Sequence, residues 1–144
     1  MIPDVNVLVA ASRADHAHHP VARPWLESAV TSASRAEPLV ILPVVAVGFV
    51  RIATGAHAFT APTPLRDALT TVGGLLAMPH VRLGVHDGEW PAFAECCERH
   101  ALAGASVTDA WIAAAVLAHR EHLVTFDRGF RRLLPPRALT VLRT

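Results

Sequence analysis

Three aspartates stand at positions where their side chains could share a cation. Asp4 lies within the first predicted strand, Asp109 lies in the first turn of a predicted helix, and Asp127 directly follows another predicted strand. In an open parallel sheet, ligand-binding groups gather at the carboxyl ends of the strands. Converging carboxylates repel one another, and a hard divalent cation with oxygen ligands turns that repulsion into a binding site. Mg²⁺ or Mn²⁺ bound there could activate water and neutralise charge on a phosphate group.

Two of the three aspartates also fit a purely structural role. Asp109 completes Ser106-Val107-Thr108-Asp109, which has the form of a capping box, and Asp127 could be the N-cap of a following short helix. Asp4 is different, because an ionisable group inside an apolar strand costs several kcal/mol unless it is paired or liganded. All 13 basic residues are arginines, so no lysine can pair with it. A bound cation is therefore the compensating charge that the sequence favours.

Apolar runs and helical spacings alternate along the whole chain. We expect strands at Ile2–Ala11, Leu39–Leu42, Val81–Val85, Leu123–Phe126 and Leu139–Leu142. We expect helices from Pro20 to before Pro38, from Pro43 toward Thr54-Gly55, from Thr63-Pro64 through Leu76, from Asp87 or Gly88 to His100, from Ser106 through Ala118, and a short basic one at Arg128–Leu134. This alternation predicts a three-layer α/β/α fold with a mostly parallel sheet of about five strands. We expect a single domain over residues 1–144.

Composition excludes several classes of protein. Hydrophobic residues make up 52% of the chain and the net charge is +1, which excludes intrinsic disorder and does not indicate a charge-driven polyanion binder. The missing lysine excludes Schiff-base and P-loop chemistry. The adjacent Cys96 and Cys97 suit neither a disulfide framework nor a zinc finger, so we expect reduced thiols. No apolar run reaches the length of a membrane span and no leader is expected, so we predict a cytoplasmic protein with no membrane contact.

Four sequence blocks in a fixed order carry a resemblance to a known family. They are Asp4-Val5-Asn6-Val7-Leu8, GFVRIAT at Gly48–Thr54, VTDAWIAA at Val107–Ala114, and LVTFDRGFRRL at Leu123–Leu133. Together they resemble PIN-domain ribonucleases of the VapC toxin type, over nearly the whole chain. The resemblance implies a PIN-like fold and a metal-dependent endoribonuclease that hydrolyses RNA phosphodiester bonds with Mg²⁺ or Mn²⁺. It also implies a VapB-type antitoxin that inserts a peptide near the active site.

The resemblance assigns roles to individual positions. The acidic metal ligands of the family fall on Asp4, Asp109 and Asp127, which would be both catalytic and metal-binding. Asn6 and Thr125 match polar positions that line the same pocket.

One position departs from the family pattern. A glutamate that the family usually carries in the helix after the second strand falls on Ala46, and no acidic residue occurs between Glu37 and Asp67. Three outcomes stay open: three carboxylates suffice, Glu37 or Asp87 reaches into the site, or catalysis is weak. The alternative function is accordingly a PIN-like module that binds RNA or a protein without efficient cleavage.

An aspartyl-phosphate enzyme of the haloacid-dehalogenase or receiver type, with Asp4 as nucleophile, is a third interpretation. The parallel sheet suits it. The missing lysine argues against it, because such sites usually place a lysine on the phosphoryl group.

Several basic residues flank these positions. Arg51, Arg128, Arg131 and Arg132 are candidates for contact with RNA or the antitoxin, because the arginine fork matches phosphate oxygens. His16, His18 and His19 lack zinc-site spacing, so we expect a solvated loop at the mouth of the site. The high apolar content predicts a homodimer or a surface covered by an antitoxin helix.

Overall fold

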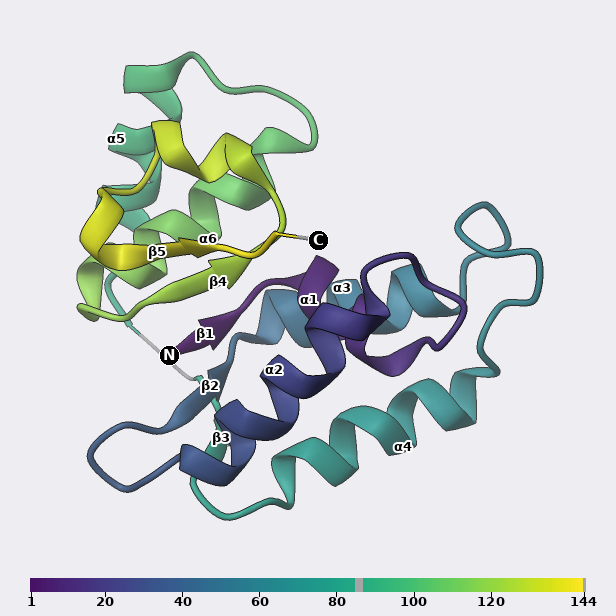
Figure 1. Ribbon diagram of the computed structural model, residues 1–144. Coiled ribbons are helices and arrows are strands. Elements are labelled where there is room, and N and C mark those ends of the chain that lie inside the picture. Colours follow the sequence, from purple (N-terminus) through teal and green to yellow (C-terminus); the bar gives the residue numbers. More distant parts are fainter. Residues whose placement is uncertain (85–86, 144) are drawn as a thin grey trace.

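The computed structural model describes residues 1–84 and 87–143, and Figure 1 shows their arrangement. The strands are β1 (Ile2–Pro3), β2 (Leu39–Ile41), β3 (Val81–Leu83), β4 (Leu123–Thr125) and β5 (Leu139–Val141). The α-helices are α1 (Val5–Ser12), α2 (His19–Ser32), α3 (Pro43–Ala53), α4 (Leu65–Leu76), α5 (Trp90–His100) and α6 (Ser106–Ala118). Two short 3₁₀ helices follow β4, namely η1 (Arg128–Arg132) and η2 (Pro136–Ala138).

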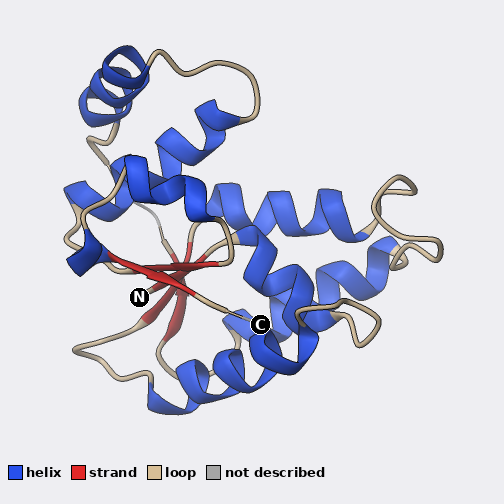
Figure 2. Cartoon of the chain, turned by 45° about the horizontal axis from the view of Figure 1, so that its top comes forward, coloured by secondary structure: helices blue, strands red, loops and turns tan. Residues whose placement is uncertain are grey.

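All described strand pairs are parallel. β4 lies between β1 and β5, and β2 pairs with β3. The backbone N–H of Val40 donates to the carbonyl of Met1 at 2.8 Å, which joins β2 to the start of β1. Figure 2 shows the strands at the centre with helices on either side. The predicted α/β architecture with a parallel sheet is confirmed.

The predicted first strand, Ile2–Ala11, is wrong beyond its first two residues. The chain leaves β1 at Asp4, whose side chain caps α1 by accepting from the N–H of Val5. Residues 7–11 are all buried, because α1 packs against α2, α3 and β4. A helix buried on every side has no polar face, so its sequence shows the same continuous apolar run as a buried strand.

The other predicted elements are present with boundaries shifted by a few residues. Val85, the predicted end of the third strand, lies outside the described residues. The predicted basic helix at Arg128–Leu134 is the shorter 3₁₀ turn η1. Within α6, Ala110 and residues 112–116 are buried, which agrees with the expectation of burial on nearly every side.

The core lies between the strands and the helices that cover them. Phe49 of α3 and Phe130 of η1 are the largest fully buried side chains, and they pack with apolar residues of β1, β2 and β4. Burying one such side chain stabilises a fold by about 1.5–3 kcal/mol. This core fixes the position of the strand ends.

No helix in the described part of the chain is long and apolar enough to cross a membrane.

Candidate active site

The three aspartates predicted from sequence line one pocket of about 770 Å³. Ile2 pairs with Leu123 and Pro3 with Val124, so the parallel strands β1 and β4 end side by side. Asp4 and Asp127 follow these two strand ends, and Asp109 comes from the first turn of α6. Helices α1 and α3 complete the walls.

Asp4 is the most enclosed of the three, with 6% of its surface exposed. Its Oδ1 accepts from the backbone N–H of Val5 at 2.7 Å. Its Oδ2 accepts from the Asn6 amide at 2.7 Å and from the Thr125 hydroxyl at 2.5 Å. Burial raises the pKa of Asp4, an effect that the Thr125 and Val5 hydrogen bonds oppose and the charge of Asp127 reinforces.

Thr125 and Asn6 hold Asp4 in a closed hydrogen-bond network. The Thr125 hydroxyl, fully buried beneath the pocket, also accepts from the Asn6 amide at 2.9 Å and from the backbone N–H of Asp127 at 2.9 Å. The Asn6 carbonyl oxygen accepts from the backbone N–H of Phe126 at 3.1 Å. Asn6 lines the pocket, whereas Thr125 acts from behind it. A fully satisfied network of this kind fixes a unique geometry.

Asp109 does not form the capping box that its sequence context suggested. Helix α6 begins after Ala105 without a side-chain cap, and the Ser106 hydroxyl donates instead to the carbonyl of Ala103. Burial, followed by the charges of Asp4 and Asp127, raises the pKa of Asp109 to about 6. The three carboxylates are therefore close enough to act on one another.

Asp127 caps a helix and also lines the pocket. Its Oδ1 accepts from the backbone N–H of Gly129 at 2.6 Å, so it caps η1 as expected. It is also exposed and lines the pocket. Capping uses one lone pair of one oxygen, so the remaining lone pairs stay available to a ligand.

This donor set fits a hard divalent cation. Carboxylate oxygens are the ligands that Mg²⁺ and Mn²⁺ prefer. Burial, and to a smaller extent the neighbouring carboxylates, raise the pKa values of Asp4 and Asp109, and a cation would favour the ionised form of both. Within residues 1–84 and 87–143, no three acidic, histidine or cysteine side chains come close enough to enclose an ion alone. Mg²⁺ commonly keeps several waters and is held by one or two carboxylates plus substrate.

No fourth carboxylate lines the pocket in the described part of the chain. Helix α3 contributes Val44, Val47, Gly48, Arg51 and Ile52 to the lining. Ala46, the position assigned to the family glutamate, is absent from that lining and packs against the core. Glu37 borders a different cavity beside β2. Asp87 is exposed and is not among the residues that line the pocket.

The basic residues predicted to flank the site divide into two groups. Arg51 lines the pocket from α3. The remaining three are exposed on η1 and do not line it: Arg128, Arg131 and Arg132. They lie directly after Asp127 in the chain.

The three histidines are partly buried and make contacts, so they do not form the solvated loop expected from the sequence. His16 lines the pocket. His18 stacks on Phe126 with ring centroids 4.5 Å apart, and Nδ1 of His19 lies 2.8 Å from the carbonyl oxygen of Ala10.

Sequence reasoning missed Phe59 and Arg13. Phe59 lines the pocket from the loop between α3 and α4, and the Arg13 guanidinium lies 4.0 Å from the centroid of its ring. The available signal was a lone aromatic residue in a segment of mostly small residues, Ala56-His57-Ala58-Phe59-Thr60.

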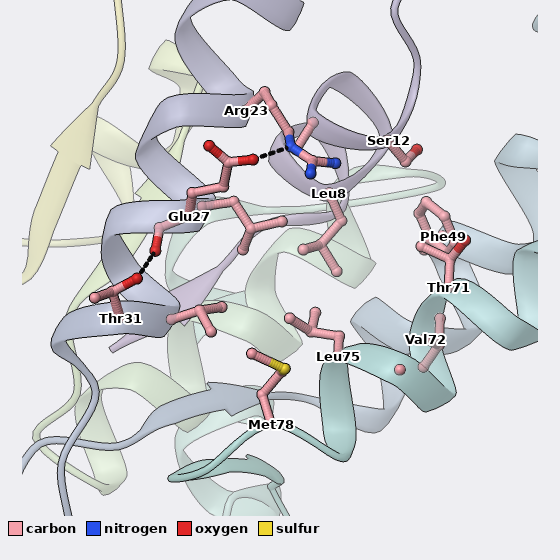
Figure 3. A pocket seen from close by; sticks show the side chains of 14 residues that line it. Leu8, Ser12, Arg23, Glu27, Thr31, Phe49, Thr71, Val72, Leu75 and Met78 are labelled. Atoms are coloured by element: carbon pink, nitrogen blue, oxygen red, sulfur yellow. Dashed lines mark hydrogen bonds and ion pairs between the residues drawn. The ribbon is translucent and has the colours of Figure 1, made fainter.

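A separate apolar groove of about 350 Å³ runs between α2 and α4 (Figure 3). Leu8, Leu26, Leu75 and Met78 supply much of its apolar lining. The ion pair between Arg23 and Glu27, at 2.6 Å, also borders it.

Comparisons with known proteins agree with this geometry. The sequence profile of the PIN domain matches residues 1–133. VapC ribonuclease Mb2897 of Mycobacterium bovis is 38% identical over 130 residues, which cover 90% of this chain and 86% of that protein. Ribonuclease VapC31 of Mycobacterium tuberculosis is 31% identical over 131 residues, which cover 90% of this chain and 89% of that protein. A crystal structure of VapBC2 from Rickettsia felis, bound to a DNA fragment from their promoter, matches with a TM-score of 0.66 at 16% identity and covers 97% of this chain and 96% of the matched chain. That structural likeness shows the same fold.

Proposed function

Because this chain belongs to the PIN-domain family, with VapC ribonucleases among its relatives, we propose that it is a VapC-type toxin that acts as a metal-dependent endoribonuclease on RNA phosphodiester bonds. The observation that carries the proposal is the meeting of Asp4, Asp109 and Asp127 in one pocket. The fully satisfied network of Thr125 and Asn6 behind Asp4 supports it further.

Asp4, Asp109 and Asp127 would hold Mg²⁺ or Mn²⁺. A bound ion would supply Lewis-acid chemistry for the phosphate and for the attacking water. Thr125 and Asn6 fix the orientation of Asp4 by binding its Oδ2, while its Oδ1 accepts a single protein hydrogen bond and keeps a free lone pair. Arg51 lines the same pocket and would contact phosphate oxygens of the RNA.

The direct test is cleavage of single-stranded RNA by the purified protein, free of antitoxin, with Mg²⁺, with Mn²⁺ or with EDTA. Asp4→Asn should lower the cleavage rate more than about 100-fold, since losing even a hydrogen-bond partner of a metal ligand costs roughly 10–100-fold. Asp67→Asn on α4, an exposed aspartate outside the pocket, is the matched control. Cleavage that persists in EDTA, or equally in Asp4→Asn, would contradict the assignment.

The partner we propose is a VapB-type antitoxin with an apolar helix that docks in the groove between α2 and α4 (Figure 3). The groove is apolar, and Met78 at its edge is 46% exposed. Met78→Arg should weaken antitoxin binding at least about 10-fold, because a charge would be buried against an apolar helix. Leu117→Arg on α6, also 46% exposed but outside the groove, should bind as wild type. Unchanged binding by Met78→Arg would place the antitoxin elsewhere.

A catalytically weak module that binds RNA or a protein is the second candidate, favoured by the absence of a carboxylate on the pocket face of α3 among the described residues. Val47 lines the pocket and is 68% exposed, whereas Ala46 faces the core. If wild type cleaves RNA only slowly, Val47→Glu should therefore raise the cleavage rate, and Ala46→Glu should not. An active wild type that Val47→Glu does not improve would reject this candidate.

We also propose that the protein is cytoplasmic. We propose that it forms a homodimer, because several large apolar side chains are exposed. These include Leu65 and Leu69 on α4 and Trp90 on α5. Light scattering of the antitoxin-free protein tests the dimer, and a monodisperse monomer would reject it.

A further inference from the structure

A single arginine ties together two loops that border the active-site pocket. The Arg13 side chain is 11% exposed, and its Nε and Nη2 groups donate to the Asp15 carboxylate at 2.9 and 2.6 Å. Its Nη1 donates to the carbonyl of Ala61 at 2.9 Å and to the Thr63 hydroxyl at 3.0 Å. The loop after α1 is thereby fixed to the loop between α3 and α4.

The same guanidinium holds an aromatic ring at the pocket wall. Its central carbon lies 4.0 Å from the centroid of the Phe59 ring. An arginine plane stacked on an aromatic face restricts the orientation of that ring. Phe59 also packs against the core and lines the pocket that contains the aspartates.

His16, from the other tied loop, lines the same pocket with a defined tautomer. Its Nδ1 accepts from the backbone N–H of His18 at 3.1 Å, so its hydrogen is carried by Nε2 when the ring is neutral. Burial, followed by the charge of His18, lowers the pKa of His16 and favours that neutral ring at pH 7. His16 is then a flat ring with one hydrogen-bond donor.

We propose that Phe59 and His16 form a subsite for one unpaired nucleobase next to the cleaved phosphate, and that Arg13 is the positioning residue of this subsite. The inference rests on the proposed ribonuclease function and specifies how its substrate is recognised. The base stacks on Phe59, and His16 Nε2–H donates to an acceptor on the edge of the base. Single-stranded RNA is characteristically bound through splayed bases stacked on aromatic side chains.

The pocket has two kinds of lining residue, one suited to a phosphate and the other to a base. The aspartates serve the phosphate through a cation, whereas Phe59 and His16 offer an uncharged, ring-lined surface that suits a base. Both groups line one pocket of about 770 Å³, so a single nucleotide can reach both. A base bound in this way adds affinity without touching the reacting atoms, which predicts an effect on KM rather than kcat.

The test measures kcat and KM on a short single-stranded RNA and on the same RNA with one base removed beside the cleavage point. Phe59→Leu keeps an apolar side chain against the core and should raise KM about 10-fold, the loss expected for one stacked base. Phe59→Trp should retain the wild-type KM. Arg13→Ala should raise KM with kcat unchanged. Arg99→Ala, which breaks the exposed pair with Glu95 on α5, is the matched control.

The RNA that lacks a base distinguishes a loss of base stacking from a general loss of structure in the variant protein. Wild type should bind it about 10-fold more weakly than intact RNA, and Phe59→Leu should bind both equally. If removal of the base weakened RNA binding equally in wild type and in Phe59→Leu, the proposal would be overturned. It would also be overturned if Phe59→Leu changed the affinity for the antitoxin and left KM for RNA unchanged, because Phe59 would then contact a protein.

Failure of the ribonuclease proposal gives a different result. Fluorescence of 2-aminopurine in the RNA, recorded in EDTA, reports stacking without cleavage. Quenching that Phe59→Leu abolishes supports the base subsite even in a protein that cuts no RNA. A wild type that cleaves RNA without quenching the probe at any flanking position rejects the subsite alone.

Discussion

Replacing Asp109 with asparagine should make the metal-free protein more stable at neutral pH. Burial and the charges of Asp4 and Asp127 raise the pKa of Asp109 from its ordinary 3.8 to about 6. The ionised carboxylate is thus disfavoured in the fold by up to roughly 3 kcal/mol, since one pKa unit corresponds to about 1.4 kcal/mol. Asp109 is only half-buried, so solvent screening reduces this to about 1 kcal/mol.

The dependence on pH follows from the direction of the shift. Between about pH 4 and pH 6 the folded protein binds a proton at Asp109 that the unfolded chain does not, so the free energy of unfolding falls as pH rises through this window. Asp109→Asn removes that contribution. At pH 7.5 the free energy of unfolding of Asp109→Asn should exceed that of wild type by about 1 kcal/mol, or about 3 °C in Tm. This difference should disappear below about pH 4.

Urea unfolding followed by tryptophan fluorescence, in EDTA at pH 7.5 and pH 3.5, measures the difference. Mg²⁺ should reduce the difference in the free energy of unfolding between Asp109→Asn and wild type at pH 7.5, because an ion that binds only the folded wild type stabilises it. Asp67→Asn should show no advantage at either pH. An Asp109→Asn protein that is less stable than wild type at pH 7.5 in EDTA, or whose gain is the same at both pH values, would refute the electrostatic argument.

Three further substitutions test other parts of the structure. Thr125→Val removes the donor to Asp4 and leaves the Asn6 amide with one partner fewer. The free energy of unfolding in urea should fall by about 1–3 kcal/mol, and titration should show a weaker affinity for the metal. Phe49→Ala should cost about 3–5 kcal/mol in the same unfolding assay, because it empties the core beneath α3. Arg51→Ala should raise KM for RNA and leave the affinity for Mg²⁺ in titration calorimetry unchanged, because this side chain lines the pocket without being an oxygen ligand.

Sequence patterns predicted most of the architecture, because most helices here have one polar face. They failed at α1, where burial on every side removes the periodicity that distinguishes a helix from a strand. The parallel strand ends were enough to predict that the aspartates would meet, since strand pairing brings Asp4 and Asp127 to one edge.

Other features of the site depend on three-dimensional geometry that no local pattern encodes. The capping box at Ser106–Asp109 was suggested by residue types alone, and the actual start of α6 does not use it. Which side of α3 faces the pocket depends on the rotation of the helix, so Ala46 could not be distinguished from Val47 by its place in the sequence. The contact between Arg13 and Phe59 joins loops 46 residues apart, a pairing that only the fold defines.

The hydrogen bond between Thr125 and Asp4 spans 121 residues of sequence, and it has a consequence for the timing of synthesis. At about 5–20 residues per second, the ribosome adds Thr125 roughly 6–24 s after Asp4. During that interval β4 does not exist, so β1 lacks this neighbouring strand and Asp4 lacks its hydrogen bond from Thr125. Because Asp109 and Asp127 also lie in the final quarter of the chain, the pocket with its three aspartates forms only as that part is made.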